Sequence, residues 1–263
     1  MRSITRTNTI MKLPITALLS VGILAAPQIS LAQPYQIEAE ANLSRSNFDF
    51  DNGGDADANV LSLSARYYLV PVETVGPWSE SAFLQKSSSG GVELSRISGD
   101  VDSDTDFTVD AFYVTPDDLI IGGELSSADE TDISVFGGRY LDDKTTAIAR
   151  ISLGDVDSLG LEYKTLMHLA SGNNLTAEAG VALLDASDTG FEIDVSATYY
   201  LSDQLGVLGG AAFQDIGDSD QFTLSTGAEY FVSETLAARG GLALGFGDPI
   251  DTTTIFVGVI GRF

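Results

Sequence analysis

Apolar and polar residues alternate with a period of two over most of the chain beyond residue 33. Between residues 191 and 201, for example, Phe191, Ile193 and Val195 fall on one face, while Glu192 and Asp194 fall on the other. This is the period of a β-strand with two unlike faces, because a helix repeats its faces every 3.6 residues. The chain is therefore predicted to be all-β.

A short turn recurs between the alternating segments. The sequence YYLSDQL at residues 199–205 returns as YFVSETL at residues 230–236, and weaker copies begin at Tyr113 and Tyr140. Each copy has aromatic residues, then a short polar turn, then a new apolar alternation. Repeated short segments with evenly spaced turn signals predict an antiparallel up-and-down sheet.

The alternation and the turns together predict about fourteen strands. An even number is expected of a membrane barrel whose two chain ends lie on the periplasmic side. The alternative is twelve, with residues 78–106 forming one elaborated loop, because the segment 78–87 alternates poorly. The fourteen predicted ranges are 35–48, 58–69, 78–87, 106–115, 119–127, 132–141, 145–154, 158–168, 175–185, 191–201, 205–215, 221–232, 236–246 and 252–263.

The connections distinguish a barrel from a soluble sandwich, which also alternates. Short connections that carry aromatic residues alternate along the chain with longer loops rich in Asp and Gly. Outer-membrane barrels sort their connections in this way, with short periplasmic turns and longer outer loops. The chain is therefore predicted to be a transmembrane antiparallel up-and-down β-barrel in the outer membrane. It has no separate plug domain, and the loop 88–105 is the one expected to be long enough to fold inward.

The first 32 residues are predicted to be a secretory signal peptide. Arg2, Arg6 and Lys12 precede an apolar run over residues 13–26, and a Ser-Leu-Ala cleavage site follows at residues 30–32. This arrangement is typical of export signals and too short to span a bilayer. The mature barrel domain is then 33–263, whether translation begins at Met1 or at Met11.

The charge of the mature chain excludes one class of partner. Removal of three basic residues and no acidic residue takes the formal net charge from −25 to −28. Nucleic acid is therefore not expected as a partner, because its recognition needs a basic surface. The chain has no cysteine, so its stability must come from packing and from a complete hydrogen-bond ladder, as in a closed barrel.

The last twelve residues carry a resemblance to outer-membrane proteins. Ile255, Val257 and Val259 share a face with the terminal Phe263. This ending looks like the signal by which the barrel-assembly machinery recognises outer-membrane proteins, and that machinery is an expected partner.

Three further motifs are Gly-Pro-Trp at residues 76–78, Ala-Phe-Leu at 82–84 and Leu-Glu-Tyr-Lys at 161–164. With them, the whole mature chain is similar to the porins of Gram-negative bacteria. The resemblance implies a passive diffusion channel for small hydrophilic solutes or ions, in contact with outer-membrane lipid and lipopolysaccharide. The alternative is a structural or surface-interaction barrel whose acidic loops bind divalent cations or lipopolysaccharide.

If the apolar faces meet lipid, the opposite faces line the lumen. Barrels of roughly eight strands are filled by side chains, whereas those of about 16 to 18 strands enclose an aqueous channel, so fourteen strands are expected to leave an open bore. The excess of acidic residues predicts a mild cation preference. The predicted pore-lining residues are Glu38, Glu40, Asp110, Glu124, Glu162, Glu178, Glu192, Asp194 and Glu229, with the cations Arg66, Arg150, Lys164, Arg239 and Arg262.

Asp100, Asp102 and Asp104 have the spacing of the first three ligands of a calcium loop. Such a loop also requires Gly at its sixth position and Glu at its twelfth, where this chain has Thr105 and Ala111. Weak divalent binding is therefore the most that is predicted, and a solvated acidic loop is the simpler interpretation.

The residues for catalysis or a cofactor are scarce. His168 is the single histidine, and it precedes a predicted turn that contains Ser171. A hydrolase needs a histidine near its nucleophile with an orienting partner, and a pair on a turn at the barrel rim fits this poorly. Without cysteine, zinc and haem sites are not expected either. The chain is predicted not to be an enzyme and to use no cofactor.

Overall fold

The computed structural model describes residues 34–263 except 51–52, 101–102, 128–130, 155, 186–188, 218 and 249. All of these residues belong to one structural unit, Ala32–Phe263. The predicted signal peptide lies outside the described residues and stays a prediction.

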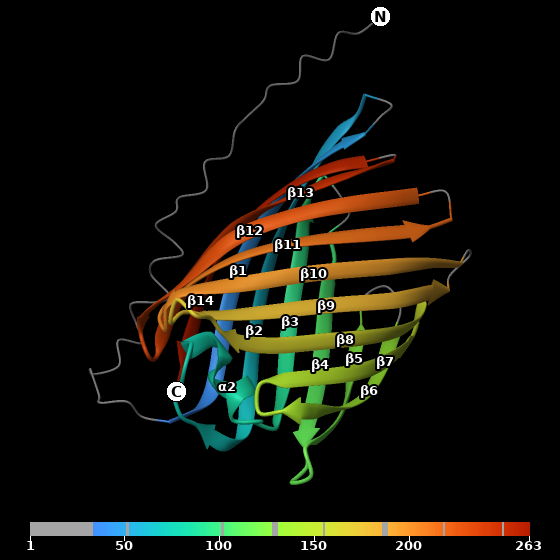
Figure 1. Cartoon of the computed structure of the whole chain (residues 1–263). Coiled ribbons are helices and arrows are strands. Elements are labelled where there is room, and N and C mark those ends of the chain that lie inside the picture. The colour runs from blue at the N-terminus through green and yellow to red at the C-terminus, as the bar shows by residue number, and fades with distance from the viewer. Residues whose placement is uncertain are drawn as a thin grey trace, which may run out of the picture. The chain divides into compact units, whose positions relative to one another are not determined.

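Fourteen antiparallel strands close into a barrel in which each strand pairs with its neighbours in the sequence (Figure 1). The last strand pairs with the first, through contacts such as Glu38 with Arg262 and Leu43 with Val257. The predicted up-and-down barrel of fourteen strands is confirmed. The strands are β1 (Tyr35–Phe50), β2 (Asp55–Val72), β3 (Ser89–Gly99), β4 (Thr105–Val114), β5 (Leu119–Ser127), β6 (Thr131–Asp142), β7 (Thr145–Leu153), β8 (Asp157–His168), β9 (Asn174–Asp185), β10 (Thr189–Ser202), β11 (Leu205–Ile216), β12 (Ser219–Ser233), β13 (Leu236–Asp248) and β14 (Ile250–Arg262).

The outer face of the barrel is apolar. Large exposed apolar side chains fall on alternate residues, as with Leu61 and Leu63 on β2 or Ile193 and Val195 on β10. A soluble protein would cover so extensive an apolar surface, whereas a membrane barrel turns it toward lipid. The polar residues of the same strands therefore face the interior.

No helix among the described residues is long and apolar enough to cross a membrane.

The third strand differs from its prediction. The segment 78–87, predicted as a strand, forms the 3-10 helix η1 (Trp78–Glu80) and the short helix α2 (Ser81–Leu84). The strand β3 instead comes from residues predicted as a loop, and it pairs regularly with β2 and β4. Its residues Val92 and Leu94 alternate with polar neighbours, whereas no period of two runs through 78–87. The strand count was right, but the position of this strand was wrong.

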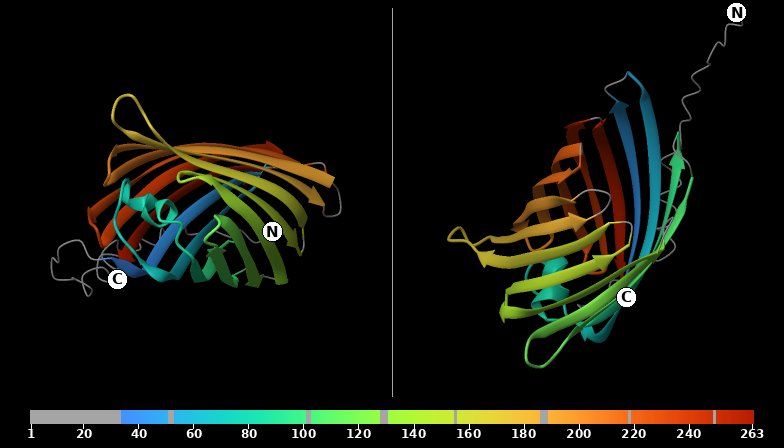
Figure 2. Two further views of the ribbon diagram at one scale, coloured as in Figure 1. Left: turned by 60° about the horizontal axis from the view of Figure 1, so that its bottom comes forward. Right: turned by 90° about the vertical axis from the view of Figure 1, so that its right-hand side faces the viewer.

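The two helices belong to a segment between β2 and β3, Glu73–Ser88, which we call the insert. It begins at the barrel end where β1 starts and β14 finishes, because Val72 pairs with Tyr35. We call this the terminal end. The insert lies among the strands at that end (Figure 2).

Candidate functional site

The insert crosses the barrel lumen and contacts widely separated strands of its wall. Three groups of contacts fix it, centred on Trp78, Glu80 and the pair Phe83 and Lys86, and their partners lie on β6, β8, β9, β10, β12 and β14 and in neighbouring turns. These strands are distributed around most of the circumference of the barrel. The insert therefore narrows the lumen at the terminal end.

Glu80 is the most buried acidic residue of the insert, with 6% of its surface exposed. Its carboxylate is 2.9 Å from Lys164 Nζ on β8. It also accepts hydrogen bonds from Tyr200 Oη at 2.8 Å and from Thr176 Oγ1 at 3.0 Å. A buried carboxylate needs such partners, because an unpaired charge away from water is very costly.

Trp78 attaches the insert to the other side of the barrel. Its indole packs edge-on against Phe231 of β12, with 5.8 Å between ring centroids. Its backbone N–H donates to the carbonyl of Asp203 at 2.8 Å, and its carbonyl accepts from Arg262 Nη1 at 2.8 Å. Arg262 is 3% exposed and also pairs with Glu38. The sequence placed Arg262 in the lumen, and the structure covers it with the insert.

The far end of the insert contacts β6 and two turns. Phe83 packs against Tyr140, with ring centroids 5.6 Å apart. Lys86 Nζ lies 2.8 Å from Asp118 and 3.0 Å from Asp143. The hydrogen bonds to these two carboxylates raise the pKa of Lys86 above its ordinary value.

These contacts correct the prediction about the element that narrows the lumen. The loop 88–105 was expected to be the only connection long enough to fold inward. In the structure most of this loop belongs to β3, and its last residue begins β4. The insert, which joins β2 to β3 at the terminal end, enters the lumen instead. Sequence reasoning missed Glu80 as a functional residue. The signal was present, because Glu80 and Lys86 shared a predicted face with Trp78 and Ala82, which no strand of a membrane barrel would tolerate.

The predicted luminal cations are all engaged in ion pairs. Arg150 Nε lies 2.8 Å from Glu162, and Lys164 Nζ lies 2.8 Å from Glu178 in addition to Glu80. Arg239 pairs with Glu40. Arg262 Nε lies 2.7 Å from Glu38. The fifth cation is described next.

Arg66 forms a bidentate ion pair with Asp110 across an intervening strand. Its two terminal nitrogens lie 2.8 and 2.9 Å from the two carboxylate oxygens. Arg66 is on β2 and Asp110 is on β4, and the residue between them in register is Gly91 of β3. A Cβ on Gly91 would lie 2.5 Å from Asp110 Oδ1 and 3.0 Å from Arg66 Nη2. The glycine leaves the space through which this pair forms.

Four of the predicted luminal carboxylates have no such cation. Glu124, Glu192, Asp194 and Glu229 make no side-chain hydrogen bond and no ion pair within the described part of the chain. The nine predicted luminal carboxylates thus exceed the five predicted luminal cations by the four that have no cation partner.

Two polar or mixed cavities lie within the lumen. One of about 370 Å³ borders the insert, with Phe83, Tyr140, Glu178 and Asp194 in its lining. The other, of about 290 Å³, lies beside the Arg66 ion pair, and five of its eleven lining residues are carboxylates. Space thus remains in the lumen beside the insert.

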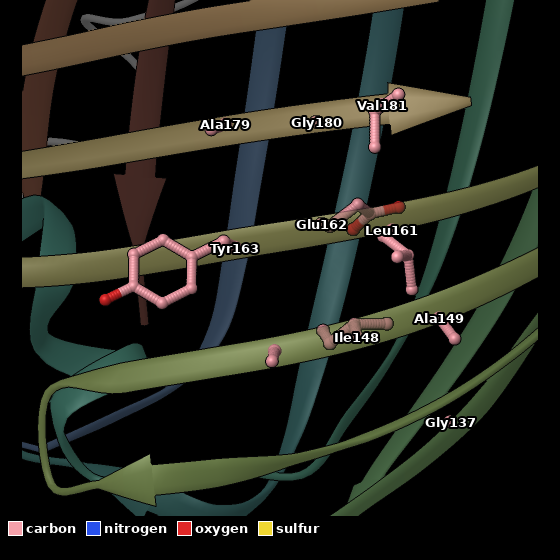
Figure 3. Close-up of a pocket in the computed structure, with 10 residues that line it drawn as sticks. Gly137, Ile148, Ala149, Leu161, Glu162, Tyr163, Ala179, Gly180 and Val181 are labelled. Carbon is pink, nitrogen blue, oxygen red and sulfur yellow. The ribbon is translucent and has the colours of Figure 1, made fainter.

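A third pocket differs from these in its lining. It lies over β6 to β9 and is lined by small and apolar residues, including Ala149, Leu161, Tyr163 and Val181 (Figure 3). Leu161 and Val181 belong to the exposed apolar face of the barrel. This pocket therefore opens mainly on the lipid-facing surface, although Glu162 is also among its lining residues.

The acidic run that resembled part of a calcium loop connects β3 to β4. Asp100 pairs with the backbone of Asp57, its N–H donating to the Asp57 carbonyl at 2.8 Å. Asp104 accepts from the N–H of Thr105 at 2.6 Å. Asp102 lies outside the described residues. Within the described ranges, no group of three or more His, Cys, Asp or Glu residues is arranged to hold a metal ion. Weak divalent binding by this loop stays a prediction.

His168 ends β8 and contacts Asn174, with 3.1 Å between Nδ1 and Asn174 Oδ1. This contact closes the β8–β9 turn, and the hydrogen-bond partner of the ring is Asn174 rather than Ser171. The proposed assembly signal lies on the outer face of β14, where Ile255, Val257 and Phe263 are exposed. Its role in assembly stays a prediction.

The comparisons with known proteins support the fold. No protein-family model matches the chain, and no curated protein matches it. Among solved structures, it resembles the Acinetobacter baumannii outer membrane protein Omp33, with a TM-score of 0.63 at 18% identity over 89% of this chain and 100% of that one. It also resembles a bacterial polysaccharide outer membrane secretin, with a TM-score of 0.53 at 11% identity over 86% of this chain and 98% of that one.

These findings define the class of protein. The closed antiparallel barrel, its apolar outer face and its structural neighbours are those of bacterial outer-membrane β-barrel proteins. The predicted fold is confirmed, and the outer membrane is the location that this fold supports.

Proposed function

We propose that the protein is an outer-membrane channel for the passive diffusion of small hydrophilic solutes, with a mild cation preference. The observation that carries the proposal is the charged inner face of a closed fourteen-stranded barrel. Charged side chains require water or partners, and barrels of this size have room for water inside. A lumen that is wet and polar offers a path to small solutes.

The cation preference is supported by the pairing of the luminal charges. All five predicted luminal cations contact carboxylates, whereas Glu124, Glu192, Asp194 and Glu229 contact no cation directly in the described residues. An ion pair contributes little net electric field at a distance. The unpaired carboxylates therefore set the sign of the electric field in the lumen. A negative field in a confined pore concentrates cations.

The insert makes this a narrowed channel, and its release from the wall would widen the path. In this proposal the terminal end faces the periplasm, as is usual for the chain ends of bacterial barrels. No catalytic step is included, because the single histidine contacts an amide and the chain has no cysteine.

One observation favours a second candidate, a structural or surface-interaction barrel that conducts little. The insert occupies the lumen and makes contacts with the wall on several sides. Such a barrel would serve through its acidic loops, with divalent cations or lipopolysaccharide as partners.

Conductance separates the two candidates. Refolded protein in a planar bilayer is compared with a variant in which Glu73–Ser87 is replaced by a five-residue Gly-Ser linker. The linker can bridge the gap, because the N–H of Leu69 already bonds to the carbonyl of Ser88. We expect larger and more frequent open steps from the variant, and a reversal potential of cationic sign in a KCl gradient. A correctly inserted variant that stays silent would support the structural barrel, and anion preference would refute the selectivity.

A further inference from the structure

Lys164 lies between a carboxylate of the insert and a carboxylate of the barrel wall. Its Nζ is 2.9 Å from Glu80 and 2.8 Å from Glu178. Glu80 is buried, with 8% of its side chain exposed, whereas Glu178 of β9 is 44% exposed. One cation thus contacts two anions, of which Glu80 belongs to the insert and Glu178 to the wall.

We propose that Glu80 and Lys164 form a latch that keeps the insert in the lumen, and that Glu178 weakens this latch by competing for Lys164. The inference rests on the proposed function, because it concerns the regulation of that channel. It assigns opposite roles to two carboxylates that contact the same ammonium group.

Because Glu178 also contacts Lys164, release of the insert costs less free energy than breaking an isolated buried ion pair. Breaking an ordinary buried ion pair is costly because a charge is left behind without a partner. Here, when Glu80 leaves for water, Lys164 retains Glu178 on the wall. Tyr200 and Thr176, which donate to Glu80, lie within 3.5 Å of each other and can remain hydrogen bonded.

The second attachment of the insert has the same property. Arg262 donates to the carbonyl of Trp78 and is at the same time paired with Glu38 of β1. If the insert leaves, the guanidinium keeps its carboxylate partner. The two wall cations that contact the insert, Lys164 and Arg262, therefore keep a carboxylate partner on the wall. Lys86, which belongs to the insert, would exchange Asp118 and Asp143 for water on release.

The test uses three substitutions that make the same chemical change. Glu80→Gln removes the latch anion, and Glu178→Gln removes its competitor. Glu73→Gln is the matched control, because Glu73 is an exposed carboxylate of the same insert and its side chain makes no hydrogen bond or ion pair in the described part of the chain. Each variant loses one negative charge, so a general change of field would affect all three alike.

Two measurements are made on each refolded protein. Single-channel recording gives the open probability. Acrylamide quenching reports the exposure of Trp78, which is the only tryptophan in the chain and lies in the insert. The second measurement follows release of the insert whether or not the barrel conducts.

We expect Glu80→Gln to raise the open probability roughly ten-fold or more, because the docked state loses its buried ion pair, and to increase quenching of Trp78. Glu178→Gln should lower the open probability, because among the described residues Lys164 would then have no carboxylate partner on the wall once Glu80 leaves. Quenching should be no greater than in the wild type. Glu73→Gln should match the wild type in both.

The latch is refuted if Glu80→Gln leaves both readouts unchanged, or if Glu178→Gln raises them as Glu80→Gln does. Heat-modifiable migration in gels confirms that each variant is a folded barrel. Tyr200→Phe, which removes one hydrogen-bond donor to Glu80, is a milder second variant and should change both readouts in the same direction as Glu80→Gln. If no variant conducts, the channel proposal fails, and the order of quenching still decides the latch.

Discussion

The substitution Arg262→Met tests the packing of the terminal end of the barrel. Arg262 is 3% exposed. Its guanidinium pairs with Glu38 at 2.7 Å and lies 4.5 Å from the ring centroids of both Tyr35 and Phe231. Methionine keeps much of the apolar stem but removes the charge and the donors. The seam between β1 and β14 therefore loses a side-chain link, while its backbone ladder stays intact.

The expected loss of stability follows from these contacts. Removing one member of a buried ion pair costs about 3 to 5 kcal/mol. Because the Glu38 side chain is 24% exposed, the cost at this site is at or below the lower end of that range. Each cation–π contact adds about 0.5 to 2 kcal/mol. The total is about 4 kcal/mol, which corresponds to a fall of about 2 M in the urea midpoint at a slope of about 2 kcal/mol per M.

Urea unfolding from lipid vesicles measures this change. Far-ultraviolet circular dichroism follows the strands, and Trp78 fluorescence follows the insert. Arg262→Lys is the matched control, because it keeps the charge but loses the planar fork that reaches Glu38 and the Trp78 carbonyl together. We expect it to lose about half as much stability as Arg262→Met.

A shift below about 0.5 M for Arg262→Met would refute this reasoning. The result would mean that the seam derives its stability from the backbone ladder alone. Unchanged circular dichroism with a lower midpoint by fluorescence would place the contribution in the insert rather than in the seam.

Three further predictions concern other parts of the barrel. Gly91→Ala should lower the free energy of unfolding by about 1 to 3 kcal/mol, because it separates the ion pair that crosses β3. Gly90→Ala should not lower it, because a Cβ there would make only an ordinary contact at 3.5 Å. Urea midpoints of the two variants test this difference. Deletion of Phe263, whose backbone bonds to the start of β1, should reduce the outer-membrane yield while export continues, and a normal yield in membrane fractions would contradict the assembly signal. Asp194→Asn, alone or with Glu192→Gln, should reduce the cation preference in reversal-potential measurements, and no change would show that other charges set the selectivity.

The sequence by itself predicted the barrel because its determinants are local. Alternation of apolar and polar residues assigns each residue to a face, and the polar turns fix where one strand ends and the next begins. Residues 191–201 and 221–232 were placed correctly within a few residues in this way. The same parity put Arg66, Asp110, Lys164 and Glu178 on one face, and the structure joins them in ion pairs.

Only the tertiary structure decided what the insert does. Its irregular pattern showed that residues 78–87 made a poor strand, but the partners of Glu80 lie 84 to 120 residues further along the chain, at Lys164, Thr176 and Tyr200. No local period relates residues at such separations. They meet because closing the barrel brings β8, β9 and β10 to face the segment that follows β2. The same closure buries Arg262, whose place in an alternating strand predicted an open lumen around it.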